Sequence, residues 1–74
     1  MPETIHIISP DISCEHCRST IEREIGNLPG INWVTVEIPS KRVDVSFDPA
    51  ATSETDILAR LDEEGYPSTE WSRD

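Results

Sequence analysis

Two consecutive runs of alternating apolar and polar residues in the middle of the chain restrict its fold more than any other feature. Valine and isoleucine occupy positions 34, 36 and 38 of the first run, and valine and phenylalanine occupy positions 43, 45 and 47 of the second. A period of two is typical of strands that bury one face. Because only a short connection through Pro39 and Ser40 separates the runs, they predict a β-hairpin.

Segments whose apolar residues recur at helical spacing precede and follow this hairpin in the sequence. Apolar residues at positions 21, 25 and 28 predict a helix over residues 15–27, with Ser13 as its N-cap. Apolar residues at positions 57, 58 and 61 predict a second helix, which follows the N-cap Ser53 and ends before Gly65.

Two outer strands complete the order of elements. Isoleucines at positions 5, 7 and 8 predict a strand over residues 4–9, and residues 66–71 are expected to form a short last strand. The resulting order predicts an α+β fold, a ferredoxin-like βαββαβ sandwich whose four-stranded antiparallel sheet carries both helices on one face. The 74 residues leave room for a single domain, residues 1–74.

This topology predicts which segments lie together. If each element crosses the domain once, three connections fall at one end: the loop before the first helix, the hairpin turn with Lys41 and Arg42, and the turn after the second helix. Cys14 and Cys17 are therefore expected to share their end of the domain with Tyr66.

The charge of the chain excludes one class of partner. Fifteen acidic residues against six basic ones give a net charge of −9, which repels phosphate backbones, so nucleic acid is not an expected partner. No apolar stretch approaches the ~20 residues of a membrane-spanning helix, and residues 1–4 carry no signal-peptide pattern. A cytoplasmic location is therefore expected, where thiols stay reduced and available as ligands.

The run Cys14-Glu15-His16-Cys17 contains the candidate metal ligands, the sulfurs of its two cysteines. A spacing of three, with one cysteine in the loop and one in the first helical turn, brings both sulfurs toward one point. The positive end of the helix dipole stabilises thiolates. Thiolates select soft ions, and two sulfurs in near-linear coordination suit copper(I) particularly well, with zinc(II) and mercury(II) as alternatives. A closed zinc site needs four ligands, and only His16 and the distant His6 are available beside the two cysteines.

Cys14 and Cys17 are also compatible with functions other than copper binding. A c-type haem attachment is excluded because Arg18, and not histidine, follows Cys17. A thiol-disulfide redox protein remains an alternative, as does a protein that binds zinc, cadmium or mercury through the same sulfurs. His16 is a candidate extra ligand, although an exposed loop histidine is the favoured interpretation.

Four segments of the chain resemble the heavy-metal-associated domain, the family of small copper chaperones and of the metal-binding domains of copper-transporting P-type ATPases. Residues 11–17 are similar to the family motif Gly-Met-x-Cys-x-x-Cys, with Asp11-Ile12 in place of Gly-Met. The segments Leu28-Pro29-Gly30-Ile31, Val43–Asp48 and Glu64-Gly65-Tyr66 also look like the family.

The resemblance implies a bacterial-type copper chaperone, not an enzyme. It implies that Cys14 and Cys17 bind copper(I) and pass it by thiol exchange to a P-type ATPase domain of the same fold. Ile12 takes the place of the buried methionine that supports the metal loop, and Tyr66 takes a position close to that loop. The chain is expected to be a monomer without metal, with a metal-bridged dimer as a second state.

Overall fold

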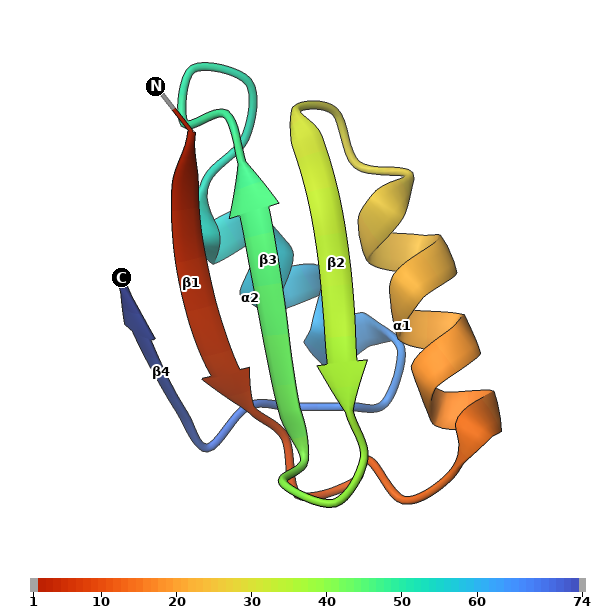
Figure 1. Cartoon of the computed structure of the whole chain (residues 1–74). Coiled ribbons are helices and arrows are strands. Elements are labelled where there is room, and N and C mark those ends of the chain that lie inside the picture. Colours follow the sequence, from red (N-terminus) through yellow and green to blue (C-terminus); the bar gives the residue numbers. More distant parts are fainter. Residues whose placement is uncertain (1, 74) are drawn as a thin grey trace.

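The computed structural model describes residues 2–73 and contains the six elements in the expected order. They are β1 (Glu3–Ile8), α1 (Glu15–Gly26), β2 (Ile31–Glu37), β3 (Arg42–Phe47), α2 (Glu54–Glu63) and β4 (Glu70–Arg73). The strands form one antiparallel sheet in the order β2-β3-β1-β4, and both helices cover the same face of it (Figure 1). The predicted ferredoxin-like fold is confirmed. Of the predicted domain, Met1 and Asp74 lie outside the described residues.

The core lies between the two central strands and the helices. Alternate residues of β1 and β3 face the helices and pair across the sheet, Ile5 with Val45 and Ile7 with Val43. All of them are fully buried, as are the apolar side chains that the helices contribute: Ile21, Ile25, Ile57 and Leu61. The period-two and helical patterns therefore located the core correctly, because each pattern reflects one face turned away from water.

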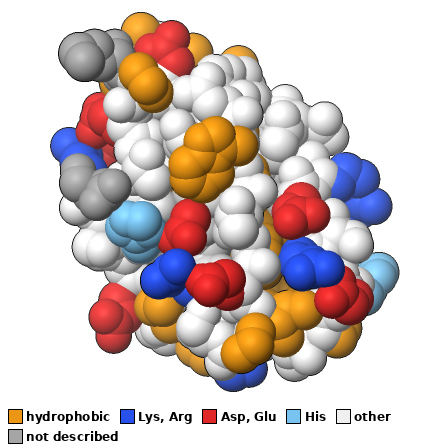
Figure 2. Space-filling view, in the orientation of Figure 1, with side chains coloured by type: hydrophobic (Ala, Val, Ile, Leu, Met, Phe, Trp, Pro, Cys, Tyr) orange, Lys and Arg blue, Asp and Glu red, His pale blue; other side chains and the backbone are white. Residues whose placement is uncertain are grey.

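The opposite face of the sheet is open (Figure 2). Charged and apolar side chains are mixed on this face, and apolar side chains gather at the end where the loops of Figure 1 meet. Trp33 and Trp71 lie on the two edge strands, β2 and β4, and are 48% and 42% exposed. Neither helix of the described chain is long and apolar enough to cross a membrane.

The two helices begin differently. The side chain of Ser53 accepts a hydrogen bond of 3.3 Å from the Asp56 N–H, so the predicted N-cap of α2 is confirmed. The predicted N-cap Ser13 of α1 is wrong, because Cys14 holds that position with φ −156° and no side-chain cap. The Cys14 carbonyl accepts the Arg18 N–H at 3.2 Å, so the N-cap lies one residue later than predicted, although α1 begins at Glu15 as expected.

The last strand also begins later than predicted. Residues 66–69 form a loop, in which the Tyr66 N–H closes the end of α2 by donating to the Leu61 carbonyl at 2.9 Å. Gly65 permits this turn with φ +89°. The first bond to β1 runs from the Thr69 N–H to the Ile8 carbonyl at 2.9 Å, so β4 begins at Glu70.

A tight contact closes the end of the domain opposite Cys14 and Cys17. Gly30 has φ +81°, and a Cβ atom built at this residue would lie 2.5 Å from the Cβ of Ala51. Its carbonyl accepts the Asp48 N–H at 2.7 Å. Only glycine fits this position, because it combines a left-handed backbone with a close approach of two chain segments.

Candidate metal centre

The two cysteines lie side by side at the start of α1 but differ in exposure. Cys14 is exposed at the N-cap position, while Cys17 in the first turn is only 8% exposed. Their sulfurs are 3.5 Å apart, and both thiols are free. The Cys17 sulfur also lies 4.0 Å from the Asp11 carbonyl oxygen. The chain thus presents two sulfurs to one point, with one of them open to solvent.

Ile12 anchors the loop that carries these cysteines. Its side chain is completely buried in the core cluster. Its N–H donates to the Ser9 carbonyl at 3.2 Å, which folds the loop back on the end of β1. Ile12 therefore lies where the supporting side chain was expected, beneath the loop.

Tyr66 contacts the buried sulfur, as the topology predicted. Its hydroxyl donates a hydrogen bond to Cys17, and this bond is the largest cause that lowers the pKa of Cys17 from 9.0 to about 6. Hydrogen bonds from the Ser13 N–H and from Cys14 lower the pKa further, while burial opposes them. The same contact raises the pKa of Tyr66, because a neighbouring thiolate disfavours a second negative charge. Cys17 is therefore mostly thiolate at neutral pH.

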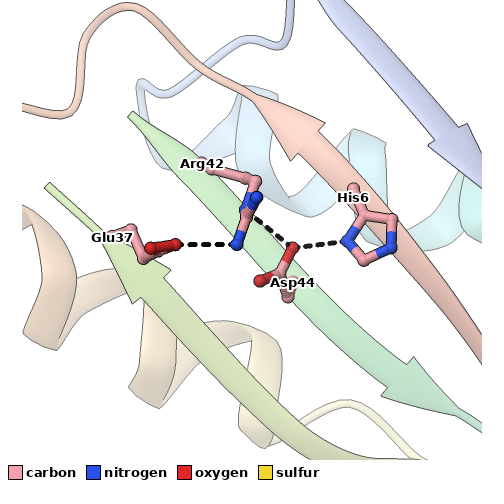
Figure 3. Close-up of polar contacts among 4 residues, drawn as sticks. All are labelled: His6, Glu37, Arg42 and Asp44. Atoms are coloured by element: carbon pink, nitrogen blue, oxygen red, sulfur yellow. Dashed lines mark hydrogen bonds and ion pairs between the residues drawn. The ribbon is translucent and has the colours of Figure 1, made fainter. Parts of the chain in front are cut away.

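The histidines do not complete a larger ligand set. His16 is exposed on the first turn of α1. His6 lies on β1, where its Nδ1 is 2.6 Å from Asp44 Oδ1, and Arg42 links Asp44 to Glu37 (Figure 3). Across residues 2–73, no three His, Cys, Asp or Glu side chains are gathered so as to hold a metal ion. The described chain thus offers two sulfurs without a preformed third ligand.

Ser9 and Lys41 join the loop that carries Cys14 to the hairpin turn and to the loop after α2. The fully buried Ser9 donates its N–H to the Lys41 carbonyl at 3.0 Å and its hydroxyl to the Pro67 carbonyl at 3.2 Å. Lys41 Nζ in turn donates to the Ile12 carbonyl at 2.7 Å. Sequence reasoning placed Lys41 at this end but missed Ser9, since a serine between Ile8 and Pro10 carries no pattern.

Such an arrangement can hold a soft ion in low coordination. Two thiolates match the preference of soft cations, and the lowered pKa of Cys17 means that a metal ion meets little competition from protons for this sulfur at neutral pH. The open side at Cys14 leaves room for a sulfur from another molecule. Beside the site, Arg18 pairs with Glu15 on the exposed surface of α1.

Several known proteins are similar to this chain in sequence and in fold. The chain is 38% identical to the copper chaperone CopZ of Bacillus subtilis over 55 residues, which cover 74% of this chain and 80% of CopZ. It is 28% identical to the mercuric transport protein periplasmic component of Serratia marcescens, over 90% of this chain and 74% of that protein. The crystal structure of oxidized MerP from Ralstonia metallidurans CH34 superposes with a TM-score of 0.87 at 28% identity, over 93% of this chain and 96% of that one. The profile of the heavy-metal-associated domain matches residues 7–67, and the chain belongs to this family.

Proposed function

We propose that this protein is a cytoplasmic copper(I) chaperone, which binds the ion between Cys14 and Cys17. The observation that carries the proposal is the pair of sulfurs 3.5 Å apart, one held as a thiolate and the other open to solvent. Two thiolates in low coordination suit copper(I) better than harder ions. The 38% identity to a copper chaperone supports copper as the cargo.

Delivery takes place by ligand exchange with a metal-binding domain of the same fold on a copper-transporting P-type ATPase. A thiolate of the acceptor forms a bond to copper(I) on the open side, and the bond from copper to Cys14 breaks. A second acceptor thiolate then replaces Cys17. The ion keeps its charge, no electron is transferred, and no organic bond is made or broken, so the protein is a carrier and not an enzyme.

Three further residues support this cycle. Ile12 anchors the loop to the core, and Tyr66 keeps Cys17 ionised. His16 lies exposed next to the sulfurs in sequence, so it is the candidate third ligand when a metal ion bridges two copies. The metal-free protein is a monomer.

Copper(I) titration under anaerobic reducing conditions tests the proposal. The wild type is expected to bind copper(I) tightly, and the double variant Cys14→Ser, Cys17→Ser is expected to lose this binding. His16→Ala is the matched control, because it changes a neighbouring exposed residue and keeps both sulfurs. Equal binding by the wild type and the double variant would overturn the proposal.

Mercury(II) is a second candidate cargo, favoured by the 28% identity to a mercuric transport component. Competition among copper(I), zinc(II) and mercury(II) for the reduced protein, with mass and oligomeric state read at each ratio, decides between the ions. The sulfur separation also fits a thiol-disulfide redox protein. That alternative requires a stable Cys14–Cys17 disulfide of defined potential and turnover of disulfide substrates.

A further inference from the structure

Lys41 makes a contact that sets it apart from the other basic residues. All five arginines pair with carboxylates: Arg18, Arg23, Arg42, Arg60 and Arg73. Lys41 is the only lysine of the sequence, and it belongs to none of the ion pairs of the described chain. Its ammonium instead donates to the Ile12 carbonyl of the metal loop at 2.7 Å.

The backbone of Lys41 is held in place for this contact. Its φ of 58° lies in the left-handed region, which glycine adopts at lower cost. Its N–H donates to the Ile38 carbonyl at 3.1 Å, and its carbonyl accepts the N–H of the buried Ser9 at 3.0 Å. The hairpin turn is therefore fixed from both sides, and glycine at this position would keep the turn but lose the ammonium.

The contacted carbonyl belongs to a peptide unit that faces the metal site. The peptide between Ile12 and Ser13 is trans, so its carbonyl and its N–H point in opposite directions. Lys41 binds the carbonyl end, and the Ser13 N–H at the other end donates to the Cys17 sulfur. A cation on the oxygen polarises the peptide and strengthens the hydrogen bond that its N–H donates.

We propose that Lys41 is a positioning residue of the metal site, whose ammonium fixes and polarises the Ile12–Ser13 peptide and thereby tightens the hold of Cys17 on the bound ion. This inference rests on the proposed function, since it assigns a determinant of affinity to the same two sulfurs. It differs from a general charge effect, because Arg42, the next residue, carries the same charge but donates to Glu37 and Asp44 on the open face of the sheet.

The test compares Lys41→Met with Arg42→Met, which removes one positive charge from the same turn. In a chelator competition, Lys41→Met is expected to bind copper(I) ~3–10-fold more weakly than the wild type, the effect of losing part of a charge-assisted hydrogen bond. Arg42→Met is expected to stay within ~2-fold, because a surface ion pair contributes little. Lys41→Arg, which restores a cationic donor, is expected to recover most of the affinity.

Two further measurements separate positioning from folding. Lys41→Gly relieves the strained backbone and removes the ammonium, so it is expected to match Lys41→Met in affinity. In the reduced metal-free protein, the amide signal of Ser13 in a ¹⁵N–¹H NMR spectrum is expected to move in Lys41→Met and to stay in place in Arg42→Met.

Three results would overturn the inference: equal weakening by Lys41→Met and Arg42→Met, wild-type affinity in Lys41→Gly, or an unmoved Ser13 signal in Lys41→Met. If the wild type binds no copper(I), the proposed function fails by itself. The Ser13 signal of the metal-free protein then still decides whether Lys41 acts on this peptide.

Discussion

Replacing Tyr66 with phenylalanine isolates the strongest influence on the buried sulfur. The ring of Tyr66 packs against the core and is retained in the variant, while the hydroxyl that donates to Cys17 is lost. The pKa of Cys17 is therefore expected to rise, because its thiolate loses a hydrogen-bond donor.

The size of the rise follows from the causes that act on Cys17. Its pKa falls from 9.0 to about 6 through four hydrogen bonds, which come from Tyr66, Ser13 and, by side chain and backbone, Cys14. Tyr66 is the largest of these causes. A hydrogen bond to a charged group contributes about 1.5 kcal/mol, and one pKa unit corresponds to ~1.4 kcal/mol, so loss of the hydroxyl is expected to raise the pKa of Cys17 by about one unit. At pH 7 the thiolate fraction of Cys17 would then fall from ~90% to ~50%.

Thiolate absorbance of the reduced metal-free protein, recorded against pH, measures this change. The rate of alkylation at pH 7, assigned to Cys17 by mass spectrometry, is expected to fall ~2-fold in parallel with the thiolate fraction. Thr20→Val is the matched control, because the Thr20 side chain bonds Tyr66 and not the sulfur. A Tyr66→Phe curve that superposes on the wild-type curve, or an equal shift of the curve in Thr20→Val, would show that the Tyr66 hydroxyl does not lower the pKa of Cys17.

Three further expectations concern stability, measured by urea denaturation of the reduced protein. Gly30→Ala is expected to destabilise the protein by more than ~1 kcal/mol, because Gly30 has a positive φ and the added Cβ would lie 2.5 Å from the Cβ of Ala51. Gly26→Ala should stabilise it by about 0.5 kcal/mol, because the added Cβ meets no atom within 4 Å. Similar losses of stability in both variants would contradict this. Ser53→Ala is expected to cost about 1 kcal/mol through loss of its cap, while Ser13→Ala, which caps nothing, should be near neutral; a reversed order would restore Ser13 as a cap. Folding lowers the pKa of Cys17, so its thiolate stabilises the fold fully above pH 9.0 and progressively less as the pH falls toward about 6. The free energy of unfolding of the wild type should therefore fall relative to that of Cys17→Ser as the pH is lowered across this window. A difference between the two proteins that does not change with pH would exclude this linkage.

Periodicity predicted the elements because each of them buries one face. The alternation around Val43 and Val45 and the helical spacing of Ile21 and Ile25 describe residues that are all fully buried. Element order then placed Tyr66 near the cysteines, and the contact between its hydroxyl and Cys17 bears out that placement. These inferences succeeded because they depend on local pattern and on chain connectivity alone.

The details that failed depend on contacts between loops. Ser13 has the side chain of an N-cap, but Cys14 takes that position and turns its sulfur toward Cys17 instead of the helix amides. The strand predicted from Tyr66 starts at Glu70, because the residues between them close α2 and meet the loop after β1. A single sequence does not reveal which loop meets which, so the role of Ser9 was missed.

The exposure of both tryptophans determines what intrinsic fluorescence can report. Trp33 and Trp71 lie on opposite edges of the sheet and are about half exposed, while the helices and central strands contain neither of them. Both indoles already contact water in the folded state, so their emission should change little on unfolding, and circular dichroism is the better probe of stability. A protein that binds to either edge of the sheet would bury one of the indoles and shift this emission, so intrinsic fluorescence can report such binding without a label.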